Sequence, residues 1–486
     1  MTALTETPTF AAGAGAGSEA PALPACRVDS AGQARVDHRA VFTLALPLMV
    51  ESAVQIVMSL TDMWFVGHIS TRAVAAVGAV QLLIIVIMCV LGGVVVPVQG
   101  IVAQFEGARR YRRASQAAWT ALWGTLCVAP LFALVGVSSR WVLAPFGLDP
   151  SVQALASEFW LPRVTGSLLG VAVWGMLGFF NGVGRPNVTL LVSVVTALVN
   201  VPFNALFIFK LGWGIAGSGW ATTVAQACGL LLSLVIFLSA AYRQNYGSHQ
   251  TWKPRLSKIG QLLKMGIPMG LLPAGDYLGI WLFQIMQVRL STTGGAATQI
   301  VMMLISLAFM PGMGIASAGT TLVGEAIGAG DRAWARRVGS RVIALGVLYM
   351  GGVGVLLALA GPWLMPIFTG SNDADSAATV ALGAQLLWLA AAYQVFDGLY
   401  VGASHCLRGA GDAVVPTALA LPVSLLIFVP LAHSLTFAPG QGWVHFLPQL
   451  GWGAIGGWVA VIVYVMLLGS TLHLRWRSPA WQQIRI

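Results

Sequence analysis

Several long stretches of this sequence contain no charged residue, and they constrain the possible folds more than any other feature. They span residues 81–98, 188–209, 215–241, 342–360 and 451–472. A helix rises 1.5 Å per residue and needs about 20 residues to cross a hydrocarbon core of roughly 30 Å. It also satisfies its own backbone hydrogen bonds, as a lipid environment requires. The sequence therefore predicts an all-α polytopic membrane protein.

The hydropathy pattern divides into twelve transmembrane helices. Composition agrees, because 57% of the residues are hydrophobic, only 9% are charged, and the mean hydropathy of +0.81 lies far above that of soluble domains. The helices are expected near residues 40–66, 77–105, 115–137, 155–180, 188–209, 214–241, 264–290, 296–323, 339–368, 377–404, 414–434 and 452–474.

Both ends of the chain are expected to be tails. Residues 1–37 are rich in Ala, Gly and Pro and lack a continuous apolar segment, so they predict a disordered tail rather than a signal peptide. Residues 475–486 form the second predicted tail.

The net charge of +10 comes from basic residues that fall in alternate loops. Of the 26 Lys and Arg residues, Arg163 lies in the fourth helix and four lie at odd-numbered loops, which leaves 21 in the tails and even-numbered loops. By the positive-inside rule both termini are cytoplasmic, in a multi-pass protein of the inner (plasma) membrane. The basic loops are thus topology signals, and the expected partners are membrane lipids rather than nucleic acid.

Cysteine and histidine give no sign of a cofactor or an enzyme. The five cysteines are scattered and form no C-x-x-C pair, so neither a disulfide framework nor a structural metal is expected. The seven histidines lie in tails, loops or near helix ends without H-E-x-x-H spacing, which argues against an enzyme. We expect a monomer that needs no cofactor.

Short motifs recur in the two halves of the chain in the same order. "LGWG" occurs at residues 211–214 and 450–453, and "FFNGVGRP" matches "CLRGAGDA" at an offset of 227. An offset of 221 places Pro268 on Pro47 and "IGAGDRAWARR" on the loop that begins "EGARRYRRAS". We infer two homologous six-helix halves.

Because six is even, the halves enter the membrane in the same orientation and are related by a pseudo-twofold axis along the membrane normal. We expect an N-terminal lobe at residues 38–242, a cytoplasmic linker at 243–263 and a C-terminal lobe at 264–474. The interface between the lobes is a natural substrate path.

Four acidic residues lie within predicted helices: Glu51, Asp62, Asp276 and Asp397. An acid at the bilayer centre costs roughly 2.5–3.5 kcal/mol on insertion scales, and in the same helices basic residues occur only toward the ends. Buried acids usually mark ion or substrate pathways, because such a carboxylate can bind a proton or a small hard cation. An interhelical hydrogen bond or ion pair is the structural alternative, and for Glu51 it is about equally favoured.

The repeat makes a purely structural role less favourable for three of these acids. An acid needed only to build the six-helix unit would occur in both halves. Instead, the partner positions are neutral, with Asp62 opposite Phe283, Asp276 opposite Gln55 and Asp397 opposite Gly170.

Neutral polar and aromatic residues lie near these acids. Asn200 and Asn204 share a helical face around Pro202, where they can support an ion site or make an interhelical amide bond. Aromatic and Met side chains can line an adaptable pocket for flat organic cations, although most such residues serve packing or lipid contact. The candidates for this pocket are Met58, Tyr277, Trp281 and Phe396.

Taken together, these motifs resemble the multidrug and toxic compound extrusion (MATE) transporters, in particular the NorM-like branch. The likeness covers residues 38–474 and the paired "AQFEGARRYRR" and "GEAIGAGDRAWARR" loops. Its motifs are P-x14-D-x4-G at Pro47, Asp62 and Gly67, G-x-P-x7-D at Gly266, Pro268 and Asp276, YQ-x2-D at Tyr393, Gln394 and Asp397, and N-x3-N at Asn200 and Asn204.

The resemblance implies a V-shaped pair of bundles and cation-coupled export. It makes Asp276 and Asp397 the coupling-ion site, where Na⁺ can bind, and Asp62 a coupling or substrate carboxylate. Glu51 is a further candidate for the role of Asp62 because of its place in an apolar helix, and not because of the resemblance. Gln55, Asn200, Asn204, Tyr393 and Gln394 are expected to support them.

The sequence also departs from the family pattern at three positions. The helix-seven acid is often Glu in this branch and is Asp276 here. Asn204 stands where another branch has an aspartate, which argues against that branch's proton site in the N-terminal lobe. Glu51 is not part of the NorM pattern, so its role stays open.

The leading functional hypothesis is a secondary antiporter that exports cationic or amphipathic organic compounds in exchange for H⁺ or Na⁺ by alternating access. The alternative is a flippase of the same superfamily that moves a lipid-linked precursor. The mid-membrane acids and the lack of Arg or Lys beside them favour the antiporter. Internal duplication and broken helices argue against a passive channel.

Overall fold

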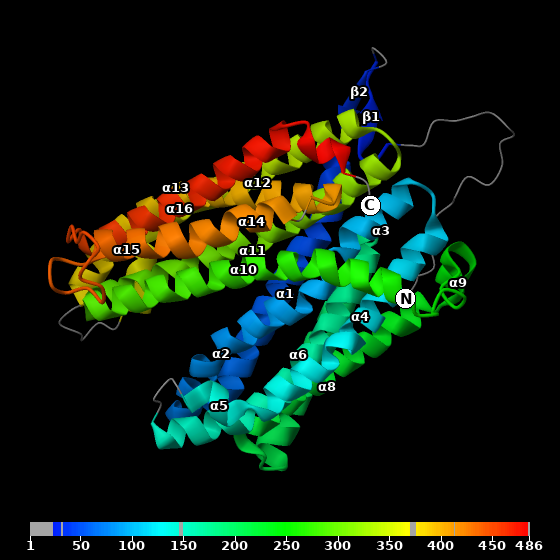
Figure 1. Ribbon diagram of the computed structural model, residues 1–486. Helices are drawn as coiled ribbons and strands as arrows, with labels where there is room; N and C mark the ends of the chain where they lie inside the picture. The colour runs from blue at the N-terminus through cyan, green and yellow to red at the C-terminus, as the bar shows by residue number, and fades with distance from the viewer. Residues whose placement is uncertain (1–22, 31–32, 145–148, 370–375, 413, 485–486) are drawn as a thin grey trace, which may run out of the picture.

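The computed structural model describes residues 23–30, 33–144, 149–369, 376–412 and 414–484 and is almost entirely helical (Figure 1). The N-terminal half contains α1 (His38–Gly67), α2 (Thr71–Gly92), η2 (Gly93–Val95), α3 (Val98–Gly107), α4 (Tyr111–Val137), α5 (Ser139–Leu143), α6 (Pro150–Gly182), α7 (Pro186–Ala205), η4 (Leu206–Lys210), α8 (Gly214–Phe237) and α9 (Ala240–Tyr246). The C-terminal half contains α10 (Leu256–Leu290), α11 (Thr292–Gly328), α12 (Arg332–Phe368), α13 (Ser376–Ala410), α14 (Val414–Pro422), η5 (Val423–Phe428), α15 (Val429–Thr436), α16 (Gly453–Arg477) and η6 (Ala480–Gln483).

Eleven helical segments in the described part of the chain are long and apolar enough to cross a membrane. The predicted second, fifth and eleventh helices are each a composite, formed by α2 to α3, α7 with η4, and α14 to α15. The predicted seventh helix is α10, which carries Lys264, Asp276 and Arg289 and is not among the eleven. It packs against α2 and α11, and with it the chain has the twelve helices that the sequence predicts.

The repeated LGWG motif has the same backbone conformation in both halves. Gly212 and Gly214 have φ of +68° and +54°, and Gly451 and Gly453 have φ of +70° and +66°. Glycine adopts this left-handed region without the steric cost that a side chain would add. In each copy the Trp between the two glycines is the N-cap of the lobe's last helix. The motif therefore recurs because each lobe makes the same turn into its sixth helix.

The other repeated loops also share their turns. Gly184 and Gly411, which the offset of 227 aligns, have φ of +70° and +84°. Arg109 and Gly330, which the offset of 221 aligns, have φ of +55° and +90°. A π-helical turn follows Pro202 at η4 and Pro422 at η5. The two halves therefore share turns and helix irregularities at matching places.

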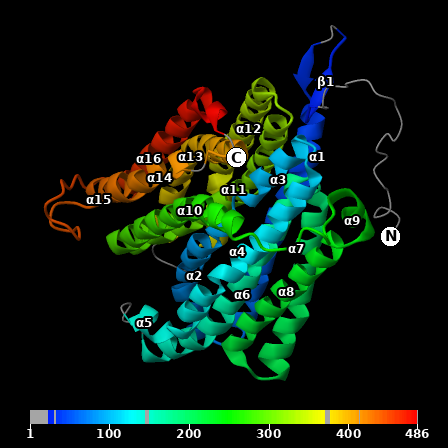
Figure 2. The ribbon, with the colours of Figure 1, turned by 45° about the vertical axis from the view of Figure 1, so that its right-hand side comes forward.

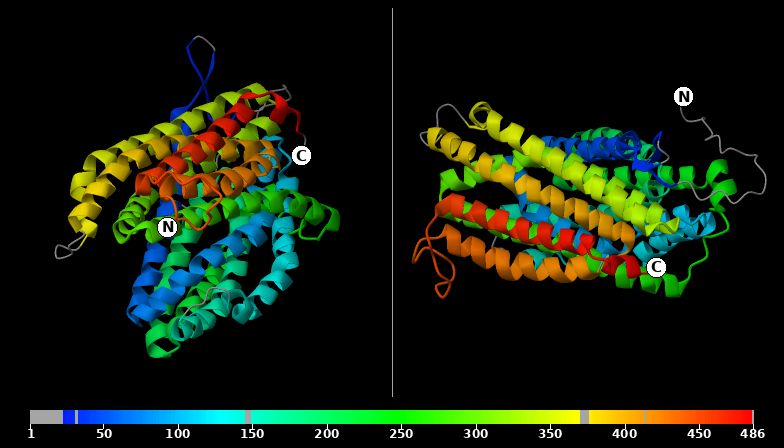
Figure 3. Two further views of the ribbon diagram at one scale, coloured as in Figure 1. Left: turned by 60° about the vertical axis from the view of Figure 1, so that its left-hand side comes forward. Right: turned by 90° about the horizontal axis from the view of Figure 1, so that it is seen from above.

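The helices form two bundles that meet at the end carrying both termini and diverge toward the other end (Figures 1 and 2). One bundle contains α2 to α8, and the other contains α10 to α16, in which α12, α13 and α16 run side by side (Figure 3). Helix α1 packs on α7 of the first bundle and on α11 of the second.

The two larger buried apolar cores extend beyond the expected lobe boundaries. Val41, Ala45 and Leu48 at the start of α1 belong to the core of the C-terminal lobe. Leu262 near the start of α10 belongs to the core of the N-terminal lobe. The first helix of each lobe thus begins against the opposite lobe.

Part of the expected N-terminal tail is ordered, and this corrects the prediction of disorder for residues 23–30 and 33–36. Strands β1 (Cys26–Val28) and β2 (Ala34–Val36) pair antiparallel, with Cys26 opposite Val36. The Trp334 indole donates a hydrogen bond to the Pro24 carbonyl at 2.9 Å and ties this hairpin to α12. Residues 1–22 lie outside the described residues.

Candidate functional site

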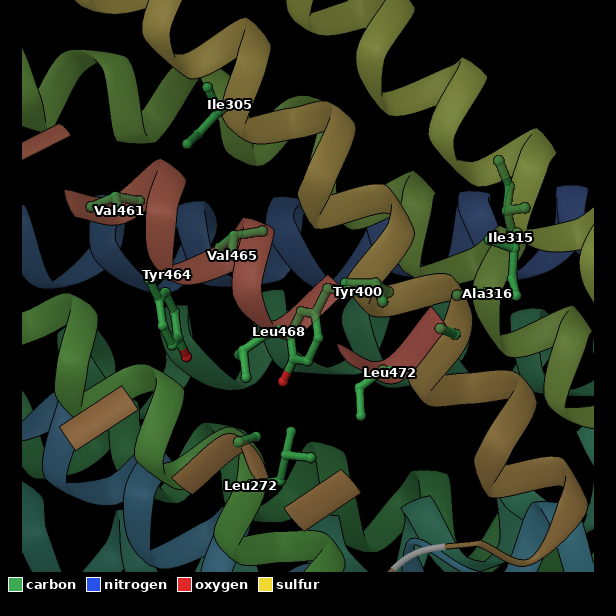
Figure 4. Close-up of a cluster of buried hydrophobic side chains, with 14 of the residues drawn as sticks. Leu272, Ile305, Ile315, Ala316, Tyr400, Val461, Tyr464, Val465, Leu468 and Leu472 are labelled. Atoms are coloured by element: carbon green, nitrogen blue, oxygen red, sulfur yellow. The ribbon is translucent and has the colours of Figure 1, made fainter. Parts of the chain in front are cut away.

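Asp276 lies in the C-terminal lobe, where side chains of three helices meet. It is on α10 and accepts hydrogen bonds from the Tyr400 hydroxyl of α13 at 2.5 Å and from the Tyr464 hydroxyl of α16. Figure 4 shows both hydroxyls directed toward the α10 segment that carries Leu272, one turn before Asp276. Both carboxylate oxygens therefore have a donor.

Asp397 lies on α13 one turn before Tyr400 and is 3% exposed. The hydroxyl of Tyr393, one turn earlier, is its hydrogen-bonding neighbour. The other oxygen of Asp397, Oδ2, is buried and has no hydrogen-bond partner among the described residues. Gln394 faces elsewhere, and its amide donates to the Ile305 carbonyl at 3.1 Å.

A cavity of about 270 Å³ connects these two acids. Pro273 and Tyr277 contribute from α10, and Met302, Phe309 and Met313 contribute from α11. The remaining wall is mostly α13, with Asp397 and Tyr400. The structure thus brings together Asp276, Asp397 and Tyr393 of the predicted coupling-ion site, and adds Tyr277 of the predicted pocket.

Arg408 and His405 also line this cavity, and this corrects the expectation that no basic side chain accompanies the acids. Both residues lie on α13, and the sequence places Arg408 only toward a helix end. Arg408 does lie in the last turn of α13, which extends to Ala410, and from there it interacts electrostatically with Asp276. The imidazole Nδ1 of His405 lies 2.9 Å from the Val401 carbonyl of its own helix.

Asp62 lies on α1 at the centre of a separate polar network in the N-terminal lobe. It accepts hydrogen bonds from the Asn204 amide at 2.8 Å and from the Thr222 hydroxyl at 3.3 Å. The Asn204 amide also donates to the Asn200 side-chain carbonyl at 2.9 Å. Arg163 of α6 interacts electrostatically with Asp62. The predicted i, i+4 asparagine pair therefore does reach an acid.

Glu51 forms a second cluster on α1, three turns before Asp62. Its Oε1 accepts from the Gln55 amide and from the Ser193 hydroxyl of α7, each at 3.2 Å. Gln55 occupies the repeat position of Asp276, but its partner in the structure is Glu51. This interhelical contact with the buried Ser193 suits the structural reading of Glu51, which is itself half-buried.

The other predicted pocket residues are not brought together. Met58 is buried in α1, whereas Trp281 and Phe396 are half-buried. None of these three lines the cavity that holds Asp276 and Asp397. Their candidacy stays a prediction.

Three contributors to the site were missed by reasoning from the sequence: Tyr464, Ser404 and Arg408. A single Tyr in an apolar helix is typical of packing, and Tyr464 lies 188 residues from the acid that it contacts. Helical spacing is the signal that could have found two of them. Ser404 and Arg408 follow Asp397 by seven and eleven residues, which places them close to the same helical face as Asp397.

A third cluster closes the lobe interface at the end with the termini. The Gln104 amide of α3 donates to the Gly409 carbonyl at 2.9 Å, and the Gln99 amide donates to the Ser317 carbonyl at 2.9 Å. The Tyr246 hydroxyl of α9 donates to Glu106 at 3.2 Å. Burial first, and then the Glu106 carboxylate, raises the pKa of Tyr246, which therefore remains a donor.

Comparison with known proteins finds a matching family model and similar sequences. The family model MatE matches residues 47–206 and 278–433. "Probable multidrug resistance protein NorM" of Pseudomonas aeruginosa is 30% identical over 461 residues, covering 91% of this chain and 90% of that protein. "Multidrug resistance protein NorM" of Burkholderia vietnamiensis is 30% identical over 454 residues, covering 90% and 93%.

Solved structures share the fold at lower identity. A crystal structure of MATE in complex with MaL6 has a TM-score of 0.79 at 18% identity, covering 91% of this chain and 97% of that one. The outward-facing conformation of a multidrug resistance MATE family transporter of the MOP superfamily has a TM-score of 0.75 at 19% identity, covering 91% and 96%. The similarity extends over both bundles.

Proposed function

We propose that this chain, which belongs to the MATE family of membrane transporters and is similar to the NorM multidrug resistance proteins, is a secondary antiporter. It exports cationic or amphipathic organic compounds in exchange for inward H⁺ or Na⁺. Membership of a transporter family agrees with the expectation that the chain is not an enzyme.

The observation that carries this proposal is the pair of carboxylates in the C-terminal cavity. Asp276 and Asp397 lie in one cavity with the hydroxyls of Tyr400 and Ser404. Carboxylate and hydroxyl oxygens are the ligands that small hard cations prefer, and a carboxylate also accepts a proton. The unpartnered Oδ2 of Asp397 supports its role as the oxygen that receives the incoming ion.

Asp62 supports a distinct role in the N-terminal lobe. Its hydrogen-bond partners Asn204 and Thr222 are neutral, so they carry no positive charge that would compete with a bound cation. Arg163 partly offsets that charge. We assign Asp62 to the exchange of coupling ion for cationic substrate.

Coupling requires that each ligand bind one state better than the other. The lobes meet at the end with the termini, which positive-inside reasoning makes cytoplasmic, and diverge at the external end (Figure 1). In this state an external cation reaches the carboxylates and neutralises them, so a positively charged substrate is released. When the cation is lost to the cytoplasm in the opposite state, the restored charge favours the next substrate.

The test is uptake of substrate into inside-out vesicles from the host's inner membrane, under an imposed pH gradient or an imposed Na⁺ gradient. An antiporter moves a fluorescent organic cation only when one of these gradients is present. Transport that ignores both gradients, in vesicles with confirmed protein insertion, contradicts the proposal.

A flippase of the same superfamily is the second candidate, and Arg408 is the observation that favours it. This side chain lines the same cavity as the acids and offers a positive charge to an anionic head group. A fluorescent lipid-linked phosphate that crosses the bilayer of reconstituted vesicles, with no gradient-driven movement of organic cations, would select the flippase.

A further inference from the structure

The face of the molecule that carries both termini contains two cavities lined by basic side chains. The larger, of about 1110 Å³, lies between hairpin strand β2, the start of α1, α12 and η6. Arg35 and His38 line it from the hairpin and α1, and Arg336, Arg337 and Arg341 line it from α12. We call it the hairpin pocket.

The second cavity, of about 240 Å³, lies between the ends of α3, α4 and α10 and the segment before α10. Its basic residues are Arg113 of α4, Arg255 before α10 and Lys258 of α10. Gln116 and Thr120 of α4 add polar groups. We call it the linker pocket.

The internal repeat relates these two pockets. The offset of 221 carries Gln116 onto Arg337 and Thr120 onto Arg341, and it carries the start of α10 onto the start of α1. In each pocket the first helix of one lobe faces the third helix of the other lobe. The pockets are therefore pseudo-symmetric, and both bridge the lobes.

The walls of the hairpin pocket are fixed by specific contacts. The Trp334 indole holds the hairpin through the Pro24 carbonyl. The Trp476 indole donates to the Ser340 hydroxyl at 3.1 Å and stacks on Trp481, with ring centroids 4.6 Å apart, which positions the C-terminal segment. The basic side chains therefore extend from anchored backbone.

The positive charge in both pockets is mostly unbalanced. Arg35 pairs with Asp29 at 2.8 Å. No carboxylate of the described chain lies within 4.0 Å of the charged nitrogens of Arg337, Arg341, Arg113 or Lys258. Arg337 and Arg341 are one helical turn apart, so both guanidinium groups project from the same face of α12.

We propose that the two pockets bind phosphate groups of anionic phospholipids at the membrane surface. Guanidinium groups match phosphate oxygens in bidentate geometry, and basic pockets between transmembrane helices at the cytoplasmic surface suit anionic head groups. Free inorganic phosphate has the same chemistry and is the alternative source. This proposal does not depend on which substrate the chain exports.

A head group in either pocket contacts both lobes while they are together at this end. A ligand that binds one state better shifts the equilibrium toward that state. Phosphate binding here is therefore expected to favour the arrangement that diverges at the opposite end.

The test compares wild type with two full-length variants that each lose four positive charges. The pocket variant carries R113Q, K258Q, R337Q and R341Q. The control variant carries substitutions at basic residues of the same face that line neither pocket, R110Q, R243Q, K253Q and R332Q. Each protein is reconstituted in vesicles of phosphatidylcholine and phosphatidylglycerol, extracted in mild detergent, and its co-extracted lipid is quantified by mass spectrometry. A second arm follows the thermal midpoint of delipidated protein during titration with inorganic phosphate at constant ionic strength.

We expect phosphatidylglycerol to be enriched several-fold over the bulk lipid in wild type and control, and not in the pocket variant. A rise in thermal midpoint with inorganic phosphate, in wild type and control only, assigns the sites to free phosphate as well. Equal enrichment and equal phosphate response in all three proteins overturn the proposal. The proposal is also overturned if the control variant loses as much phosphatidylglycerol enrichment as the pocket variant, because lipid binding then depends on net charge alone.

Discussion

Asp276 and Asp397 line one cavity but have different hydrogen-bonding surroundings. Tyr400 and Tyr464 occupy both oxygens of Asp276, whereas Oδ2 of Asp397 has no partner in the described chain. A buried acceptor without a partner costs free energy that a bound cation or proton recovers. We infer that Asp397 receives the ion first and that Asp276 is held in place to complete the site.

Substituting either acid by Asn tests this assignment. Asp397→Asn and Asp276→Asn keep the side-chain volume but remove the charge. Hydrogen bonds to charged groups contribute about 1.5–3 kcal/mol, so gradient-driven efflux is expected to fall roughly tenfold to a hundredfold. Efflux of a fluorescent organic cation from energised cells measures this.

Asp331→Asn is the matched control, because Asp331 only caps α12 and Asn caps helices about as well. It should transport normally. Wild-type rates for both cavity variants from pH 6 to 8, with and without Na⁺, would remove these carboxylates from the mechanism.

The Asp62 network predicts a separate defect in substrate binding. Asp62→Asn removes the charge, whereas Glu51→Gln removes a charge from a cluster that joins α1 to α7. We expect Asp62→Asn to weaken binding of a monovalent organic cation by about tenfold, equivalent to about 1.4 kcal/mol, with no change for a neutral ligand. Fluorescence polarisation on purified protein measures both ligands.

Glu51→Gln should retain cation binding and change only the thermal midpoint, since interhelical hydrogen bonds in membranes contribute about 0.6 kcal/mol on average. The opposite pattern, with cation binding lost in Glu51→Gln and kept in Asp62→Asn, would exchange the two roles.

The sequence shows the acids but does not assign the hydroxyl donors of Asp276, and the reason is physical. A carboxylate in an apolar helix is costly, so its presence alone points to a function. Tyr464 and Tyr400 carry no such cost, and only the register between α10, α13 and α16 shows that they donate to Asp276. Arg408 lies in the last turn of α13, as expected from the sequence, but only the structure shows that this turn lines the same cavity as the acids.

At the scale of helices, close packing of α3 on α11 depends on glycine. A Cβ on Gly107 would lie 1.9 Å from the Glu325 carbonyl oxygen, and a Cβ on Gly328 would lie 2.0 Å from the Gln104 carbonyl oxygen. Both approaches are far shorter than a van der Waals contact. The two backbones can meet here only where side chains are absent.

Gly107→Ala is therefore expected to separate the lobes at this end. Added volume in a tight contact costs about 1–3 kcal/mol, which disfavours the arrangement seen here and slows efflux. Pulsed electron spin resonance between labels on α4 and α12 should show a longer distance. Gly352→Ala in α12 is the control, because nothing lies within 4 Å of its added Cβ. An unchanged distance in Gly107→Ala would show that this seam adapts without opening.

Helix positions could be read from hydropathy, but the short irregular elements could not. The hairpin at β1 and β2 has strands of three residues, too short for alternation to be seen, and the indole that bonds to it, Trp334, is distant in sequence. The π-helical turn at η5 follows Pro422. Proline predicts a break in helical hydrogen bonding and does not specify how the backbone closes it.

For the whole molecule, the internal duplication predicted the two bundles. It did not predict that the first helix of each lobe begins against the core of the opposite lobe. Repeated motifs such as LGWG impose the same turns on both halves, and those turns are visible in sequence because glycine adopts a positive φ at little steric cost. Val41 and Leu48 pack in the core of the opposite lobe, and no sequence motif indicates this packing. Apolar residues at a helix start satisfy either lobe equally well.

The remaining prediction concerns the orientation of the whole molecule in the membrane. The sequence assigns 21 basic residues to the tails and even-numbered loops, against four at odd-numbered loops, and this predicts that both termini are cytoplasmic. A phosphatase that is active only outside the cytoplasm should be inactive when fused after Ile486 and active when inserted after Gly440, between α15 and α16. The insertion is the internal control, because it shows that the fused enzyme can fold. Activity at Ile486 with none at Gly440 would invert the molecule, so the lobes would then diverge toward the cytoplasm and the basic pockets would face outward.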